Sequence, residues 1–437
     1  MKGKHSIFQM VIFGIFAFFI ILAVFIFAGL GGSGGSQGVG TVTVWGTFDQ
    51  DMMDDYLSQL NDTDTMAGHI KYVQIPEDSF NSELIDALAS GTGPDLFFLD
   101  QSNILKYWNK IYPIPYDGIS KRGYMDTFVD EAELFLSKRG ILGMPFAIDP
   151  MVLYWNRDIF AESGIGKPPK YWNELLKMSE QITKTDENSN IEISTIAFGT
   201  FDNVNHAKDI LATLIMQKGG GIVQRTEDGQ LYSAIDPQGK LEGVSPAQVV
   251  VRSYTEFANP SKPVYTWNSS LPNSLDMFAR GKLAMYIGYA SEIKKIKSKN
   301  PNLNFDVAVL PQVLGGENRR TLTFGKMYAV AIPKQAKNIY GASVISNFLS
   351  GSLASTFFAK INDTFSPRRG ILSTQSDDVL KEVFRRSALI ARAWLDPNPA
   401  KTDKIFRNMI NYIISGRMRY SEAVARANRE LRALIQE

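Results

Sequence analysis

The sequence predicts an α/β fold preceded by one membrane-spanning helix, and three observations support this prediction. Runs typical of strands alternate with amphipathic, helix-like runs through most of the chain, a pattern that predicts a sheet covered by helices on both faces. The length of 437 residues is enough for two or three domains of about 150 residues each. Finally, an uncharged apolar run occupies residues 10–30.

The apolar run at residues 10–30 predicts a transmembrane helix, because about 21 residues rising 1.5 Å each span the roughly 30 Å of bilayer hydrocarbon. Lys2 and Lys4 precede it and the next charge is Asp49. This asymmetry places residues 1–9 in the cytoplasm as a short stub and exports the rest of the chain. A cleaved signal peptide is the alternative, although its apolar region is usually only about 7–15 residues long.

The exported body follows a Gly- and Ser-rich stretch at residues 31–40, which predicts a flexible linker. Residues 41–45 alternate as a strand does, and a helix is predicted at about 50–60. A second strand at 69–75 precedes an amphipathic helix that ends at Gly91, and then a buried strand at 94–99. Such alternation predicts a mainly parallel sheet, with ligands bound beyond the carboxyl ends of its strands.

A second set of elements, with a core of its own, begins near Pro145. It comprises predicted helices at residues 169–181 and 206–217 and predicted strands at residues 195–199, 283–288, 305–310 and 327–332. From about Ser376 onward the apolar residues recur at helical spacing, with Trp394 on one such face.

The composition excludes several classes of protein. The chain has no cysteine, which excludes disulfide frameworks, Cys-based zinc sites, iron–sulfur clusters and thiol nucleophiles. Its 46 Lys and Arg residues nearly balance 45 Asp and Glu residues, whereas nucleic-acid-binding proteins normally carry an excess of positive charge. We therefore expect no nucleic-acid partner, and we predict neither a metal nor a cofactor.

Segments spread over the body carry a family resemblance. The most specific is GMPFAIDPMVLYWNRDIF at residues 143–160, and others follow or precede it at residues 88–95, 164–174, 277–285, 307–311 and 416–417. In this order they resemble the family 1 extracellular solute-binding proteins, the receptor subunits of sugar-importing ABC transporters. Two positions depart from the family pattern, with Trp155 where Tyr is usual and Tyr171 where Thr is usual.

The resemblance implies a type II periplasmic-binding-protein clamp, whose two lobes close on a buried solute by hinge motion. Mapped by order, lobe one holds residues 41–147 and 312–360, and lobe two holds residues 150–308 and 366–437. The implied ligand is a sugar or oligosaccharide, and the implied partners are ABC permease and ATPase subunits. We expect a monomeric body without enzymatic activity, tethered to the cell membrane and facing the periplasm or the extracellular space.

A sugar site needs aromatic rings against the apolar sugar faces and carboxylates or amides at the hydroxyl groups. Side chains of these kinds follow predicted strand ends or lie in loops between elements. We predict ligand contacts from Trp45, Asp49, Asp100, Asp149, Phe201, Asn203, Trp267, Gly288, Tyr289 and Trp394. The resemblance adds that Asp149 matches an acidic ligand contact of maltose-type members, and that Asp100 and Tyr289 match positions near the ligand.

Structural roles are the alternative for several of these residues. Trp45 and Trp394 are equally compatible with packing in a core, and Asp49 and Asp100 with capping a helix. Two other functions also stay open at this point: a tethered sensor or adhesion module on the same fold, and an exported hydrolase acting on carbohydrate. Hydrolysis of a glycoside needs two facing carboxylates, whose separation a sequence does not give.

Overall fold

The computed structural model describes residues 38–188, 190–226, 228–236, 244–315 and 321–436. The predicted transmembrane helix at residues 10–30 and most of the predicted linker lie outside these ranges. Within them, no helix combines the length and the apolar character that crossing a membrane requires.

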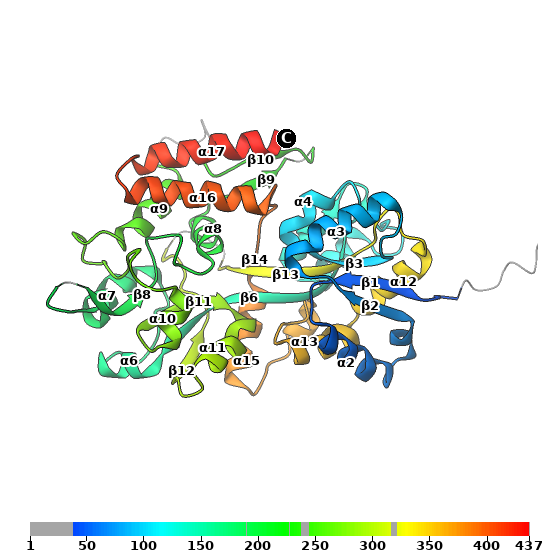
Figure 1. The fold of residues 1–437 in the computed structure, drawn as a ribbon, viewed down its shortest axis with the longest axis horizontal. Coiled ribbons are helices and arrows are strands. Elements are labelled where there is room, and N and C mark those ends of the chain that lie inside the picture. Colours follow the sequence, from blue (N-terminus) through cyan, green and yellow to red (C-terminus); the bar gives the residue numbers. More distant parts are fainter. Residues whose placement is uncertain (1–37, 189, 227, 237–243, 316–320, 437) are drawn as a thin grey trace, which may run out of the picture.

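Two lobes share one ten-stranded sheet, and strand β6 (Met144–Asn156) runs from one lobe into the other (Figure 1). The strand order is β2-β1-β3-β13-β6-β11-β8-β7, with β12 paired to β6 and β14 paired to β13. Strands β13 (Thr323–Ala331) and β14 (Ala391–Arg392) and helix α15 (Val379–Leu389) accompany β6 between the lobes.

Lobe one carries the amino-terminal strands and the helices that cover them. Its elements are β1 (Val42–Gly46), α2 (Gln50–Asn61), β2 (Ile70–Gln74), α3 (Glu77–Ser90), β3 (Leu96–Asp100), α4 (Ile104–Tyr107), α5 (Lys121–Thr127), β4 (Leu136–Ser137), β5 (Gly140–Ile141), α12 (Ile339–Leu349), α13 (Ser352–Asn362) and α14 (Arg369–Leu372).

Lobe two carries most of the middle of the chain and its carboxyl-terminal helices. Its elements are α6 (Arg157–Glu162), α7 (Leu175–Ile182), β7 (Lys184–Thr185), β8 (Ile191–Ile196), α8 (Ala207–Gln217), β9 (Val223–Arg225), β10 (Leu231–Ser233), α9 (Pro246–Glu256), α10 (Ser274–Ala279), β11 (Leu283–Tyr289), α11 (Ile293–Lys299), β12 (Phe305–Ala308), α16 (Pro399–Ile414) and α17 (Tyr420–Gln436).

Each lobe has its own apolar core. Lobe two has one large cluster, whereas lobe one has two clusters, one on either face of its part of the sheet. Leu372 of α14 packs in a lobe-one cluster together with Tyr124 of α5. The sequence-based boundary therefore differs from the structure here, because residues after 366 pack on lobe one before the chain passes to lobe two.

The prediction of a mainly parallel sheet is wrong at the centre of the sheet. Strand β1 pairs in parallel with β2 and β3, and β8 pairs in parallel with β11. However, β13 is antiparallel to both β3 and β6, and β11 and β12 are antiparallel to β6. The reason is that the chain enters lobe two along β6 and returns to lobe one along β13, so the two shared strands run in opposite directions.

The predicted elements of the amino-terminal part are confirmed to within two residues. Gly91 ends α3 in the left-handed conformation, with φ of 70°, which a residue without a Cβ adopts at little cost. Two strand predictions are displaced, since β8 ends at Ile196 and β13 begins at Thr323. Trp394 was expected on a helix but lies in an irregular segment between β14 and α16.

Candidate ligand-binding site

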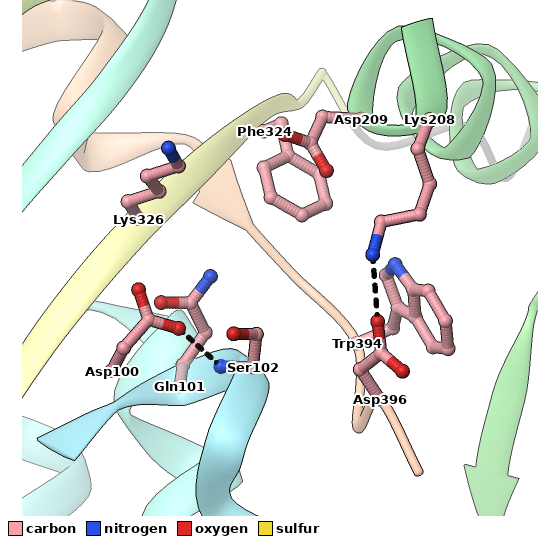
Figure 2. A pocket seen from close by; sticks show the side chains of 9 residues that line it. All are labelled: Asp100, Gln101, Ser102, Lys208, Asp209, Phe324, Lys326, Trp394 and Asp396. Carbon is pink, nitrogen blue, oxygen red and sulfur yellow. Dashed lines mark hydrogen bonds and ion pairs between the residues drawn. The ribbon is translucent and has the colours of Figure 1, made fainter. Parts of the chain in front are cut away.

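A polar pocket lies between the lobes, where lobe one, lobe two and the shared strand β13 meet (Figure 2). It encloses about 130 Å³. Its lining residues are Asp100, Gln101 and Ser102 of lobe one, Lys208 and Asp209 at the start of α8, Phe324 and Lys326 of β13, and Trp394 and Asp396 before α16. Two of the ten predicted contacts, Asp100 and Trp394, belong to this set.

Asp100 is the last residue of β3 and also caps the short helix that follows. One of its carboxylate oxygens accepts a hydrogen bond from the Ser102 backbone N–H at 2.7 Å. The buried Gln101 side chain accepts from the Met327 N–H at 2.9 Å and so fixes this turn to β13. The second carboxylate oxygen of Asp100 has no hydrogen-bond partner among the described residues, which leaves it available to a ligand.

Lys208 and Asp209 reach the pocket from the first turn of α8. His206 precedes this helix in the left-handed conformation, with φ of 58°, and its Nε2 lies 3.1 Å from Glu292 Oε1. Burial raises the pKa of Glu292, but the hydrogen bonds and the charge of His206 outweigh burial and lower that pKa overall. The His206–Glu292 contact therefore fixes the helix start, and with it the two charged side chains, against β11.

Lys208 and Asp396 form an ion pair across the pocket wall, with Nζ 2.9 Å from Oδ2. Asp396 is buried, and its oxygens also accept hydrogen bonds from the Thr402 hydroxyl and the Asn398 N–H. Burial raises the pKa of Asp396, while Lys208 opposes that rise. Lys208 Nζ additionally lies 5.9 Å from the Trp394 ring centroid. The Lys208–Asp396 ion pair therefore helps to position the indole, and the charges of both residues are already neutralised by each other.

Lys326 differs from Lys208, because it forms no ion pair or hydrogen bond among the described residues. Its Nζ lies 4.3 Å from the ring centroid of Tyr289, whose hydroxyl donates to Asp209 Oδ2 at 2.7 Å. Tyr289 is itself buried, and it contacts two lining residues, Lys326 and Asp209, without lining the pocket. An ammonium group held over an aromatic face remains able to donate to a ligand oxygen.

Asp149 is placed away from the pocket wall, buried at the middle of β6 with 5% of its surface exposed. Its carboxylate accepts hydrogen bonds from the Ser291 N–H at 3.1 Å and the Ser291 hydroxyl at 2.6 Å. Burial raises the pKa of Asp149 to about 6, although the Ser291 bonds and Lys326 act in the opposite direction. In this structure the carboxylate connects β6 to the short helical turn Ala290–Glu292, which precedes α11.

Three further predicted residues lie in lobe two, outside the pocket wall. Trp267 is completely buried, and its indole N–H donates to Asn203 Oδ1 at 3.1 Å. The amide of Asn203 donates in turn to the carbonyls of Asn268 and Leu271. Phe201 is buried as well, beneath the Arg407 guanidinium at 4.9 Å. None of the three lines the pocket, because their polar atoms and ring faces are used to hold local loops together.

The remaining predicted residues have local structural roles. Asp49 caps α2 by accepting from the Met52 N–H at 3.0 Å. Trp45 packs against a lobe-one cluster. At Gly288 a Cβ would collide with the Glu292 carboxylate, so this glycine allows the carboxylate to approach β11.

The residues that sequence reasoning missed are mostly charged. Lys208 and Asp209 stood at the start of a predicted helix, where charged residues are usually solvated. Lys326 and Phe324 fell outside the predicted strand, which began four residues too late. Asp396 lies two residues after Trp394, a predicted aromatic contact, and this proximity was the one signal that could have identified a missed residue. Among the described residues no group of three or more His, Asp or Glu side chains is arranged to hold a metal ion.

A second and larger cavity also borders Trp394 and encloses about 710 Å³. Leu134 lines it from lobe one, and residues 219–225 line it from lobe two. Trp394 belongs to the walls of both cavities. The space between the lobes therefore consists of a small charged pocket and a wider chamber, which we call the inner pocket and the outer chamber.

Two lobes joined by crossing strands, with a polar pocket between them, define a two-lobed solute-binding protein of type II. Comparison with known proteins agrees. Residues 61–352 match the model of the bacterial extracellular solute-binding protein family, and the chain belongs to this family. The resemblance noted in the sequence is thus confirmed.

Individual relatives are distant in sequence but similar in fold. A putative binding protein of Brucella abortus is 23% identical over 327 residues, which cover 74% of this chain and 72% of that protein. A solute-binding protein of Thermotoga lettingae, solved with α-D-tagatose, has a TM-score of 0.66 at 19% identity and covers 91% of this chain and 100% of its own. A cyclic α-maltosyl-1,6-maltose binding protein of Arthrobacter globiformis has a TM-score of 0.71 at 16% identity, covering 91% and 99%.

Proposed function

We propose that this protein is a membrane-tethered receptor that captures a sugar or oligosaccharide by closure of its lobes and delivers it to an ABC permease. The observation that carries the proposal is the inner pocket, where an indole, three carboxylates and two ammonium groups from different elements converge. Sugars present flat apolar faces and a rim of hydroxyl groups, and this combination of side chains matches both.

The free polar atoms of the inner pocket support a hydroxylated ligand. Asp100 and Asp209 each retain a carboxylate oxygen without a hydrogen bond among the described residues, since only one oxygen of each accepts from the protein. Lys326 retains its donors. Acceptors and donors side by side suit sugar hydroxyl groups, which both donate and accept, better than a simple cation or anion. The Thermotoga and Arthrobacter proteins with the same fold are described as sugar binders, which supports the same class of ligand.

The predicted tether supports the transport part of the proposal. A helix at residues 10–30 would hold the receptor at the membrane surface, and the linker at residues 31–40 would let the body reach a permease. Confinement of this kind raises the effective concentration of the receptor near its partner without any new contact.

Replacing Asp100 with Asn tests the assigned site. The amide keeps an oxygen for the Ser102 N–H but loses the negative charge, so a hydrogen bond from a sugar hydroxyl to a charged acceptor is lost. Such bonds contribute about 1.5–3 kcal/mol, which corresponds to a roughly ten- to hundredfold weaker affinity. The measurement is calorimetric titration of the full chain in detergent with a panel of mono- and oligosaccharides.

Asp49→Asn is the matched control, because Asp49 caps a helix in the same way but does not line the pocket. Its affinity for the sugar should equal that of the parent protein. Equal losses in both variants would place the site elsewhere, and a panel without any bound sugar would contradict the proposed ligand class. Deleting the gene should abolish uptake of the bound sugar, whereas a sensor or adhesion module would leave uptake intact.

A further inference from the structure

A small hairpin of lobe two reaches across the space between the lobes. It consists of β9 and β10, which pair antiparallel with Tyr232 opposite Gln224. The Ala234 N–H donates to the Ile222 carbonyl at 2.7 Å and extends the hairpin by one rung. The Asn428 amide of α17 donates to the Asp236 carbonyl at 3.0 Å and so fixes the base of the hairpin to lobe two. Figure 1 shows β9 and β10 beside α16 and α17, on the side of α16 that faces lobe one.

The far side of the hairpin contacts lobe one directly. Nη1 of Arg225 donates to the Leu136 carbonyl at 2.8 Å. Leu136 lies in β4, and the Tyr116 hydroxyl holds the next residue by donating to the Ser137 carbonyl at 2.7 Å. Leu231 of β10 packs against a core cluster of each lobe. The hairpin therefore offers lobe one a charged hydrogen bond and an apolar contact together.

These contacts lie at the outer chamber, whose wall also includes Leu322 directly before β13 and Arg392 of β14. Arg225 belongs to the wall of the outer chamber. The crossing strand β13 forms part of the inner pocket wall through Phe324 and Lys326. Asp363, which follows α13, is in the left-handed conformation with φ of 49°. When the lobes turn about the crossings at β6 and β13, the separation of Arg225 from Leu136 must change, and a hydrogen bond persists only below about 3.2 Å between heavy atoms.

We propose that the β9–β10 hairpin is a latch that favours the closed clamp, with Arg225 as its positioning residue. This inference rests on the proposed function only in assuming that the lobes move. A contact formed in one state alone shifts the equilibrium toward that state by its own free energy. Because a ligand binds the closed clamp, its apparent affinity follows the closed fraction.

Spin labels on the two lobes measure the closed fraction without any ligand. The chain has no cysteine, so Glu83→Cys on α3 and Lys404→Cys on α16 give a pair of unique attachment sites, both exposed and one on each lobe. The distance distribution is recorded by double electron–electron resonance on the full chain in detergent. Arg225→Ala should lower the closed-to-open ratio about ten- to hundredfold. The distance distribution should therefore move to longer distances.

Arg139→Ala is the matched control. Arg139 lies at the turn of the opposing β4–β5 hairpin, and its exposed side chain makes no ion pair or hydrogen bond among the described residues. It should leave the distribution unchanged. Arg225→Lys should return part of the closed population, because the ammonium group can still donate but lacks the planar fork of the guanidinium.

Identical distributions for Arg225→Ala and the parent protein would overturn the latch. If Arg225→Ala does not fold, Leu231→Ala replaces it, since it removes the apolar contact instead, and an unchanged distribution there has the same meaning. Because these distances are measured without ligand, they are independent of the sugar titration. A latch that opens on mutation in a protein that binds no sugar would leave this inference standing and remove the proposed ligand class.

Discussion

Glu131→Gln is expected to make the folded protein markedly more stable at pH 8 and to leave it nearly unchanged at pH 5. Glu131 lies in a short helical segment of lobe one with 1% of its surface exposed, and neither carboxylate oxygen has a hydrogen-bond partner among the described residues. It faces Gly325 of β13, where a Cβ would collide with the carboxylate. Burial raises the pKa of Glu131 to about 8, and the charge of Asp100 adds to this, while Arg392 opposes it.

The sign follows from the two protonation states. The pKa of Glu131 is 4.5 in its ordinary state and about 8 in the folded protein. Between these values the unfolded chain has released the proton that the folded chain still holds. The free energy of unfolding therefore falls as the pH rises through this window, by at most about 1.4 kcal/mol for each pH unit. Gln cannot ionise, so the variant avoids this loss and should be several kcal/mol more stable at pH 8 by the same conversion.

Urea unfolding between pH 4 and 9 measures this effect as the difference between variant and parent. Other groups, such as Asp149, titrate in both proteins and cancel in the difference. Glu133→Gln is the control, since Glu133 is exposed on the same helical segment, and its difference should stay flat. A flat difference for Glu131→Gln as well would show that Glu131 is ionised in the folded protein.

Trp267→Ala is expected to destabilise the protein by about 3–5 kcal/mol, the usual cost of removing a buried Trp. The indole is completely buried in the lobe-two core. Its loss leaves a cavity and also removes the hydrogen bond to Asn203, which anchors the loop at Asn268 and Leu271. Sugar affinity of the folded variant should stay unchanged, because Trp267 does not line either cavity between the lobes.

Trp108→Ala controls for the loss of an indole, because Trp108 is 58% exposed on lobe one. Its unfolding free energy should match that of the parent to within about 0.5 kcal/mol. Chemical denaturation and sugar titration of both variants complete the measurement. If Trp267→Ala kept full stability and lost sugar binding, the indole would be a ligand contact after all, as the sequence suggested.

Two pocket residues could be predicted because they follow local sequence patterns. The remaining assignments depend on contacts between segments that are far apart in the chain. Asp100 was recognisable because a buried strand ends directly before it, and ligands gather at such strand ends. Trp267 fits no helical or strand periodicity and Asn203 lies in a loop after a predicted strand, so the sequence predicts ligand contacts from both. Their burial depends on loops about 64 residues apart in the chain folding against each other. No local pattern reports such a contact.

Charged residues show the same limit. Lys208 and Lys326 are ordinary lysines in the sequence, yet one is committed to Asp396, 188 residues away, and the other is free to donate. Asp149 matched a ligand position by its place in a motif. Its carboxylate is instead bound by Ser291, 142 residues later in the chain. A carboxylate is free for a ligand only if no protein group already forms a hydrogen bond or ion pair with it. Those protein groups come from distant segments of the chain.

The sequence by itself determined the α/β class, the order of the amino-terminal elements and the family, because these depend on periodicity and on short motifs that each act locally. It also determined the prediction of a tether at residues 10–30. Only the tertiary structure decided the antiparallel centre of the sheet, the residues that line the inner pocket and the contact between Arg225 and Leu136. Each of these depends on where two remote segments meet, and that is fixed by packing of the whole chain, in which burial and hydrogen-bond satisfaction are shared among all the segments at once.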